Sequence, residues 1–139
     1  MSAMKLIRRR PTLADGFTLI ELLIVMSLIV VLSSVALVGY QNSVVRAREA
    51  TLMDDLHKLR EAIDQYYADK QRWPAALQDL VTDGYVRKIP DDPMTNSADT
   101  WQTVPAEADP ANPAAEPGIF DVKSGSDKTS LDGKPYSEW

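Results

Sequence analysis

The chain of 139 residues contains no cysteine and a single histidine. Without cysteine it has no disulfide, no thiolate zinc site and no thiol nucleophile. It also lacks a glycine-rich phosphate loop, a Gly-x-Ser-x-Gly elbow and a His-Glu-x-x-His motif. His57 lies among charged neighbours, and the pairs Asp54–Asp55 and Asp91–Asp92 are adjacent residues, suited to capping or solvation. The sequence therefore predicts no enzyme and no catalytic residue.

Positive charge is concentrated at the start of the chain. The basic residues among the first sixteen are Lys5, Arg8, Arg9 and Arg10, and Asp15 is the one acidic residue there. The whole chain has 15 basic and 20 acidic residues, so the remainder has 11 against 19 and a net charge of −8. Because such a surface is repelled by phosphates, we expect no nucleic acid partner.

An apolar segment of 22 residues, 17–38, follows the basic start. Its polar residues are Thr18, Glu21, Ser27, Ser33 and Ser34. A helix of about 20 residues matches a hydrocarbon core roughly 30 Å thick, so the segment is predicted to cross a membrane. The preceding basic residues favour a cytoplasmic N-terminus. Everything after Tyr40 is then expected on the opposite side.

Three interpretations of this segment are open. A secretory signal would be cut after Ser34–Ala36, although the apolar core of such signals usually spans only about 7 to 15 residues. A simple single-pass anchor leaves Glu21 inside the bilayer, at a cost of roughly 2.5 to 3.5 kcal/mol on insertion scales. Cleavage between Gly16 and Phe17 would create a new amine, and the same amine on a neighbouring subunit would then pair with Glu21.

The octapeptide Gly16–Leu23, GFTLIELL, resembles the processing site of type IV pilins and type II secretion pseudopilins. The resemblance implies that a prepilin peptidase cuts after Gly16 and that the new N-terminal Phe17 is N-methylated. It also implies that Glu21 guides the docking of subunits. Many members of the family carry a helix-bending proline where this chain has Val38–Gly39. The shape of the helix at that point therefore stays open.

Beyond the membrane segment the apolar residues fall on one helix face, at Val45, Leu52, Leu56, Leu59, Ile63 and Tyr66. No proline occurs between Pro11 and Pro74, so a single helix is predicted from Phe17 to about Lys70. We expect the apolar stripe to pack against the protein's own C-terminal half.

The C-terminal half predicts one short helix and two strands. Trp73–Val81 is predicted to be helical and to stop at Gly84, with Leu77, Leu80 and Val81 packing on the long helix. The segments Asp99–Val104 and Ile119–Lys123 predict an antiparallel strand pair against that helix. Six prolines in residues 90–117 indicate an extended surface loop. The last segment, Lys134–Trp139, is expected to pack back through Tyr136 and Trp139.

A second group of motifs extends the resemblance. Trp-Pro, Leu-x-x-Leu-Val, Gly-Tyr and Ile-Pro-x-Asp-Pro follow one another from Trp73 to Pro93, as in the major pseudopilin of type II secretion. Residues 121–133 are rich in oxygen ligands, and major pseudopilins carry calcium in a similarly placed loop. The resemblance thus implies calcium, with Ser124, Asp127 and Asp132 as candidate ligands. An ordinary polar loop is the alternative, because the same region carries Lys123, Lys128 and Lys134.

These patterns predict an α+β, pilin-like fold with a leader at 1–16, a transmembrane and assembly helix at 17–38 and a head at 39–139. The resemblance implies a subunit of a type II secretion pseudopilus, a helical filament of identical copies based in the bacterial inner membrane, with the head in the periplasm. Its partners would be prepilin peptidase, the inner-membrane secretion platform and minor pseudopilins. The alternatives are a type IV pilus subunit, for adhesion, motility or DNA uptake, and a membrane-anchored binding domain that keeps its leader.

Overall fold

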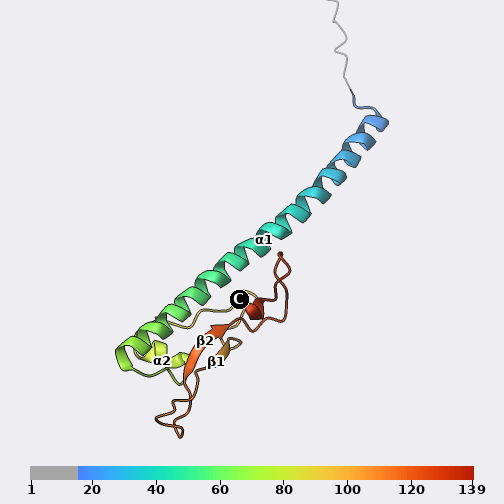
Figure 1. Cartoon of the computed structure of the whole chain (residues 1–139). Coiled ribbons are helices and arrows are strands. Elements are labelled where there is room, and N and C mark those ends of the chain that lie inside the picture. Colours follow the sequence, from blue (N-terminus) through green and yellow to red (C-terminus); the bar gives the residue numbers. More distant parts are fainter. Residues whose placement is uncertain (1–15) are drawn as a thin grey trace, which may run out of the picture. The chain divides into compact units, whose positions relative to one another are not determined.

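The computed structural model describes residues 16–139 (Figure 1). Its elements in chain order are α1 (Leu19–Lys70), α2 (Leu77–Thr82), β1 (Gln102–Pro105), β2 (Ile119–Lys123) and the short 3-10 helix η1 (Tyr136–Glu138). They form two compact units, residues through Val38 and Gly39–Trp139, and α1 contributes residues to both. Of the predicted leader, all but Gly16 lies outside the described residues. The α+β, pilin-like fold predicted from sequence is confirmed.

Helix α1 is continuous over 52 residues and passes through Val38–Gly39 without a break. A proline would remove one amide from the helical hydrogen-bond ladder, and its absence here accounts for the unbroken helix. The hydroxyl of Ser43 donates to the carbonyl oxygen of Gly39 at 3.0 Å, as expected within a regular helix. The predicted end at Lys70 is confirmed, whereas the predicted start at Phe17 is two residues too early.

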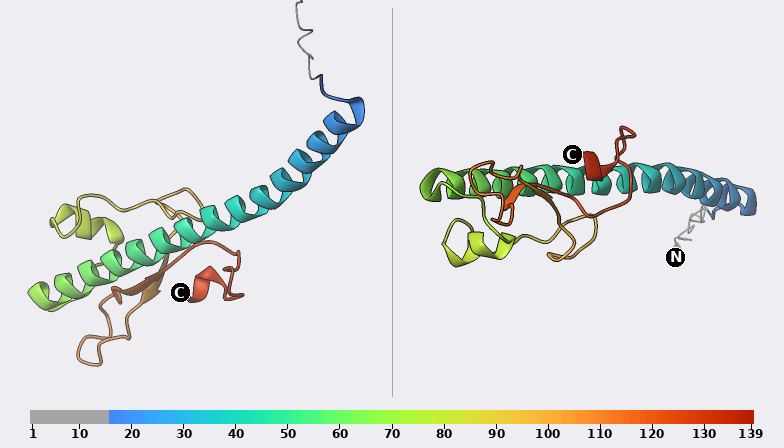
Figure 2. Two further views of the ribbon diagram at one scale, coloured as in Figure 1. Left: turned by 90° about the horizontal axis from the view of Figure 1, so that it is seen from above. Right: turned by 60° about the horizontal axis from the view of Figure 1, so that its bottom comes forward.

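The core of the unit Gly39–Trp139 forms along one face of α1. That face consists of the predicted stripe together with Ala62, and the residues buried on it are Leu52, Leu56, Leu59, Ala62, Ile63 and Tyr66. Val45, at the end of the stripe, is only partly buried. In the left view of Figure 2, α2 and the strand pair lie on opposite sides of α1. The remaining core residues come from these flanking segments and are Leu80, Trp101, Ile119, Val122 and Tyr136.

Strands β1 and β2 pair antiparallel, with Thr103 opposite Val122 and a register irregularity at Val104/Pro105. The predicted extent of β2 is confirmed, but β1 begins at Gln102 rather than at Asp99. The reason is local, because the amide of Asp99 donates to the hydroxyl of Ser97 at 3.1 Å. A side-chain bond of this kind offers the backbone a turn in place of the ladder.

Helix α2 is shorter than predicted, beginning at Leu77 rather than at Trp73. The carboxylate of Asp79 accepts hydrogen bonds from the amides of Ala75 and Ala76, at 3.0 and 3.1 Å, and so fixes the start of the helix. Gly84 follows its end with φ of +82°, a conformation that glycine adopts without strain. Leu80 is buried and Leu77 packs partly against the core, whereas Val81 is half-exposed.

The C-terminal segment packs back onto the head as predicted. Tyr136 is buried, and the ring of Trp139 meets it edge-on at 5.2 Å between centroids. Arg60 of α1 binds both strand β2 and the C-terminal segment. Its Nε donates to Asp121 at 2.7 Å, and its Nη2 donates to the carbonyl oxygen of Trp139 at 2.7 Å. The strand pair and the last segment are therefore both fastened to α1.

Candidate processing and assembly site

The predicted cleavage site lies in an exposed, non-helical segment before α1. Gly16, Phe17 and Thr18 have no regular secondary structure, and the side chain of Phe17 is 82% exposed. A Cβ placed on Gly16 would meet no atom within 4 Å. The bond between Gly16 and Phe17 thus lies outside α1, and its cleavage stays a prediction.

Thr18 caps the helix that follows. Its Oγ1 accepts a hydrogen bond from the amide of Glu21 at 3.2 Å, and its carbonyl oxygen accepts one from the amide of Leu22 at 3.1 Å. A threonine in this position satisfies amides that have no partner inside the first turn. This cap explains why α1 begins at Leu19 rather than at Phe17. The start of α1 could have been predicted from Thr-x-x-Glu at residues 18–21, a recognisable capping pattern.

Glu21 occupies the first turn of α1, and its side chain is exposed. The amide groups at a helix start carry a partial positive charge, which favours a carboxylate there. Among residues 16–139 the structure gives its side chain no hydrogen bond and no ion pair. Docking of Glu21 against the Phe17 amine of another copy stays a prediction.

The segment 17–38 presents apolar side chains on every side of the helix. Each of its large hydrophobic residues is at least 44% exposed, and none of the most apolar stretch is buried within the chain. Two of its three serines are paired inside the helix, because Ser27 and Ser34 donate to the carbonyl oxygens of Leu23 and Val30, at 2.7 and 2.8 Å. Hydroxyl groups paired in this way suit an environment without water. By length and composition, α1 can cross a membrane.

The three residues predicted to bind calcium differ in burial. Ser124 is fully buried and its hydroxyl donates to the carboxylate of Asp92 at 2.6 Å. Asp127 and Asp132 are exposed. Within the described part of the chain, no group of three or more histidine, aspartate or glutamate residues is placed to hold a metal ion. Calcium at these residues therefore stays a prediction that comes from the resemblance.

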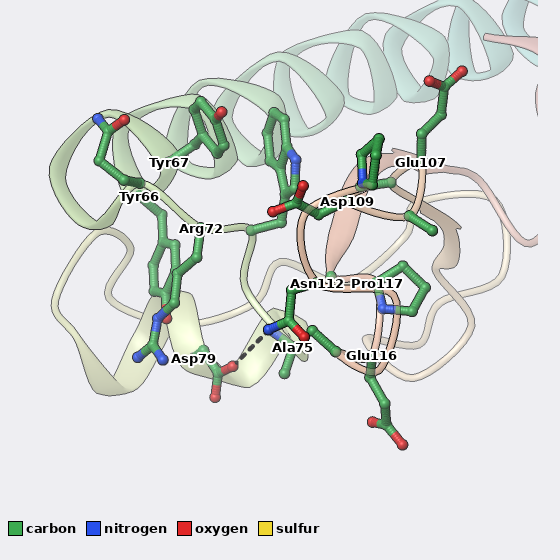
Figure 3. A pocket seen from close by; sticks show the side chains of 17 residues that line it. Tyr66, Tyr67, Arg72, Ala75, Asp79, Glu107, Asp109, Asn112, Glu116 and Pro117 are labelled. Carbon is green, nitrogen blue, oxygen red and sulfur yellow. Dashed lines mark hydrogen bonds between the residues drawn. The ribbon is translucent and has the colours of Figure 1, made fainter.

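A groove of about 760 Å³ lies between the end of α1 and the proline-rich loop (Figure 3). Tyr67 and Trp73 stack along it at 4.1 Å between ring centroids. Four carboxylates also line the groove, but they do not converge. Asp79 is committed to the amide of Ala75, and Figure 3 shows that the Glu107 and Glu116 side chains point away from one another.

Comparisons with known proteins single out the same N-terminal segment. Residues 14–37, which include Gly16, Phe17 and Glu21, match the family described as the prokaryotic N-terminal methylation motif. Type II secretion system core protein G of Klebsiella michiganensis is 30% identical over 94 residues, covering 56% of this chain and 66% of that protein. The chain is type IV pilin-like. No solved structure gives a significant match.

The relatives of this chain also include subunits of pili. Fimbrial protein EcpC of Eikenella corrodens is 42% identical over 60 residues, which cover 43% of this chain and 39% of that protein. Type IV major pilin protein PilE1 of Neisseria gonorrhoeae is 43% identical over 65 residues, 45% of this chain and 38% of that protein. The chain thus spans about two fifths of the length of these two pilins. The predicted resemblance to pilins and pseudopilins is confirmed.

Proposed function

We propose that this pilin-like chain is a structural subunit of a type II secretion pseudopilus. The subunit is cut by prepilin peptidase between Gly16 and Phe17 and assembles with other copies into a helical filament that helps to drive protein secretion. The observation that carries the proposal is the apolar surface of residues 17–38, which lies almost wholly within the matched N-terminal methylation motif and which the described residues leave uncovered.

Two environments in turn would cover that surface. Burial of one large apolar side chain is worth about 1.5 to 3 kcal/mol, so a whole helix of them is not stable in water. Before assembly the helix lies in the bacterial inner membrane, with the N-terminus in the cytoplasm and the head in the periplasm. After assembly it packs against the same segment of neighbouring copies, with Glu21 paired to the Phe17 amine of one of them. The secretion platform and minor pseudopilins are the further partners.

The length of the alignments supports secretion over pili. The match to core protein G extends over 94 residues, whereas the matches to EcpC and PilE1 extend over 60 and 65. The second candidate function is that of a type IV pilus subunit, favoured by the higher identity of 42% to 43% in those shorter matches. Deletion of the gene decides between them. Loss of secreted proteins with surface pili intact supports the pseudopilus, and the reverse result supports the pilus.

The processing step is tested by the mass of the N-terminal peptide from the membrane fraction. A chain that starts at N-methylated Phe17 is expected. A start at Leu37 would identify an ordinary secretory signal, and an intact leader would identify a plain anchor. Either of these two results contradicts the proposal.

The role of Glu21 is tested by Glu21→Gln, which keeps the size of the side chain and removes its charge. We expect normal cleavage and methylation, but a fall in filament yield of about tenfold or more, because an amine left without its carboxylate is costly away from water. Sheared filaments measured by immunoblot give the yield. The matched control is Glu107→Gln, an exposed glutamate of the proline-rich loop, which should assemble like the parent chain. Equal yields from the two variants would remove Glu21 from the assembly mechanism.

A further inference from the structure

Asp92 is a carboxylate with no exposed surface, in the turn that precedes β1. Its Oδ2 accepts hydrogen bonds from the hydroxyl of Ser124 at 2.6 Å and from the amide of Gly125 at 3.2 Å, and its Oδ1 accepts one from the amide of Met94 at 2.8 Å. A buried carboxylate is costly unless donors surround it. Two of these three donors lie more than thirty residues further along the chain. Asp92 thus joins the turn to the segment that follows β2.

The two joined segments also touch through their backbones. A Cβ on Gly125 would lie 1.9 Å from the carbonyl oxygen of Thr100, so the chain passes there in direct contact and only glycine fits. The backbone of Asp92 is also bonded within its own turn. Its amide donates to the carbonyl oxygen of Ser97 at 3.0 Å, and the carbonyl oxygen of Asp92 accepts a bond from the amide of Asn96 at 2.7 Å. We call Asp92, Ser124, Gly125 and the Met94 amide the clasp.

The serine hydroxyl groups of the clasp and of the loop after it are committed to backbone amides. Ser124 Oγ accepts from the amide of Ser126, Ser126 Oγ from that of Lys128, and Ser130 Oγ from that of Lys134, at 3.2, 3.2 and 3.1 Å. All three serines are buried. Calcium requires about six to eight oxygen ligands around one point. The residues present do not fit that requirement, because the serine hydroxyls are enclosed and bonded elsewhere.

A second carboxylate fastens the far end of the same loop. Glu49 of α1 accepts from the amide of Leu131 at 2.9 Å and from the hydroxyl of Tyr136 at 2.8 Å. The loop from Ser124 to Leu131 is therefore held at both ends by carboxylates that come from outside it. The carboxylates of Asp92 and Glu49 both accept hydrogen bonds from neutral donors, and an ion coordinated by either carboxylate would have to displace them.

We propose that the clasp closes the C-terminal loop of this head in place of a calcium ion, so that the head folds and stays folded without calcium. The resemblance to major pseudopilins implies calcium in this loop, and the clasp is the device that makes the ion unnecessary here. The proposal does not depend on filament assembly or leader cleavage. The prediction of cleavage before Phe17 and the prediction of a calcium-independent head can therefore fail independently of one another.

The first test is thermal unfolding of the full-length chain in detergent micelles, followed by tryptophan fluorescence. Trp73, Trp101 and Trp139 all lie in the unit Gly39–Trp139, so the signal reports on the head. We expect the same Tm in excess EGTA and in millimolar calcium, to within about 1 °C. Calcium at about 100 times its Kd would raise Tm by about 10 °C or more. A rise of that size that is lost in Asp127→Asn or Asp132→Asn would overturn the proposal.

The second test compares Asp92→Asn with Asp127→Asn, a matched change at an exposed position. We expect Asp92→Asn to lower Tm by about 5 to 15 °C, because an amide cannot accept all three bonds of the carboxylate, and Asp127→Asn to leave Tm unchanged. If Asp92→Asn does not accumulate, Ser124→Ala is the milder variant, with an expected loss of about 4 °C or more in EGTA. A Tm equal to that of Asp127→Asn, for whichever clasp variant is measured, would contradict the role of the clasp.

Discussion

The two units of this molecule differ in where they place their apolar side chains. In residues 17–38 every large apolar side chain is exposed, whereas the head buries a core in which Leu52, Leu59 and Ile63 have no exposed surface. The head also pairs its buried polar atoms, since the described residues contain no buried side-chain nitrogen or oxygen without a partner. The head is thus specified by its own contacts, while in the proposed function the apolar segment would acquire its packing from lipid or from other copies. Substitutions in the two units should therefore have separable effects.

Gly125→Ala should give the largest effect, confined to the head. The added Cβ would lie 1.9 Å from the carbonyl oxygen of Thr100, so the free energy of unfolding should fall by about 3 to 5 kcal/mol. Denaturant unfolding followed by tryptophan fluorescence measures the loss. Gly39→Ala is the matched control, because a Cβ there meets no atom within 4 Å, and its stability should be unchanged or higher. Equal stability of the two variants would show that the head tolerates a shift at Thr100.

Ile29→Arg should give the converse result, with the effect confined to the apolar segment. A cation at the centre of a spanning helix costs roughly 2.5 to 3.5 kcal/mol on insertion scales. We expect filament yield to fall by about tenfold or more while the Tm of the head stays unchanged. Ile29→Leu, which preserves the apolar surface, is the control. A lower Tm of the Ile29→Arg head would mean that the two units are coupled.

Glu49→Gln probes the attachment of the C-terminal segment to α1. An amide oxygen accepts less strongly than a carboxylate, so we expect a loss of about 1 kcal/mol, or about 4 to 8 °C in Tm. Glu61→Gln on the same helix is the control, because its carboxylate is exposed and accepts a single bond of 3.5 Å from Gln65. If the two variants melt at the same temperature, the hydrogen bonds from Leu131 and Tyr136 to Glu49 contribute nothing to the stability of the head.

The smallest effect is a pH dependence at high pH. Burial and the hydrogen bond to Glu49 raise the pKa of Tyr136 to about 12 from an ordinary value of 10.0. Because the folded state holds this proton more tightly than the unfolded state, stability is fully present below about pH 10 and declines as pH rises towards 12. Tyr136→Phe should make the decline shallower. Part of the decline in stability should remain in this variant, because the hydrogen bond to Asp69 raises the pKa of Tyr85 to about 12 as well. An identical pH profile for parent and variant would contradict the assignment.

Local patterns predicted most of the fold. The stripe from Leu52 to Tyr66 and the limits of β2 follow from periodicity and residue type alone. The starts of the two helices were predicted wrongly because a short-range side-chain bond overrode the pattern, at Thr18 before α1 and at Asp79 before α2. Both capping residues are visible in the sequence, so these boundaries were predictable in principle.

The role of Asp92 was not predictable in the same way. The sequence suggested solvation or capping for Asp91 and Asp92 alike, yet Asp91 is exposed and Asp92 is fully buried. The bond from Met94 is a local turn contact, but the bonds from Ser124 and Gly125 cross more than thirty residues. Contacts of that range depend on how the turn and the loop meet in space, and no local pattern encodes them.

The cap at Thr18 has a consequence for a subunit cut after Gly16. The new ammonium group of Phe17 would lie one residue before the cap, next to the amides of the first turn, which carry partial positive charge themselves. A lone subunit would therefore hold its terminal amine where its own helix repels it. In the proposed filament, the carboxylate of a neighbour's Glu21 would relieve this repulsion, so each arriving copy would stabilise the terminal amine of another subunit.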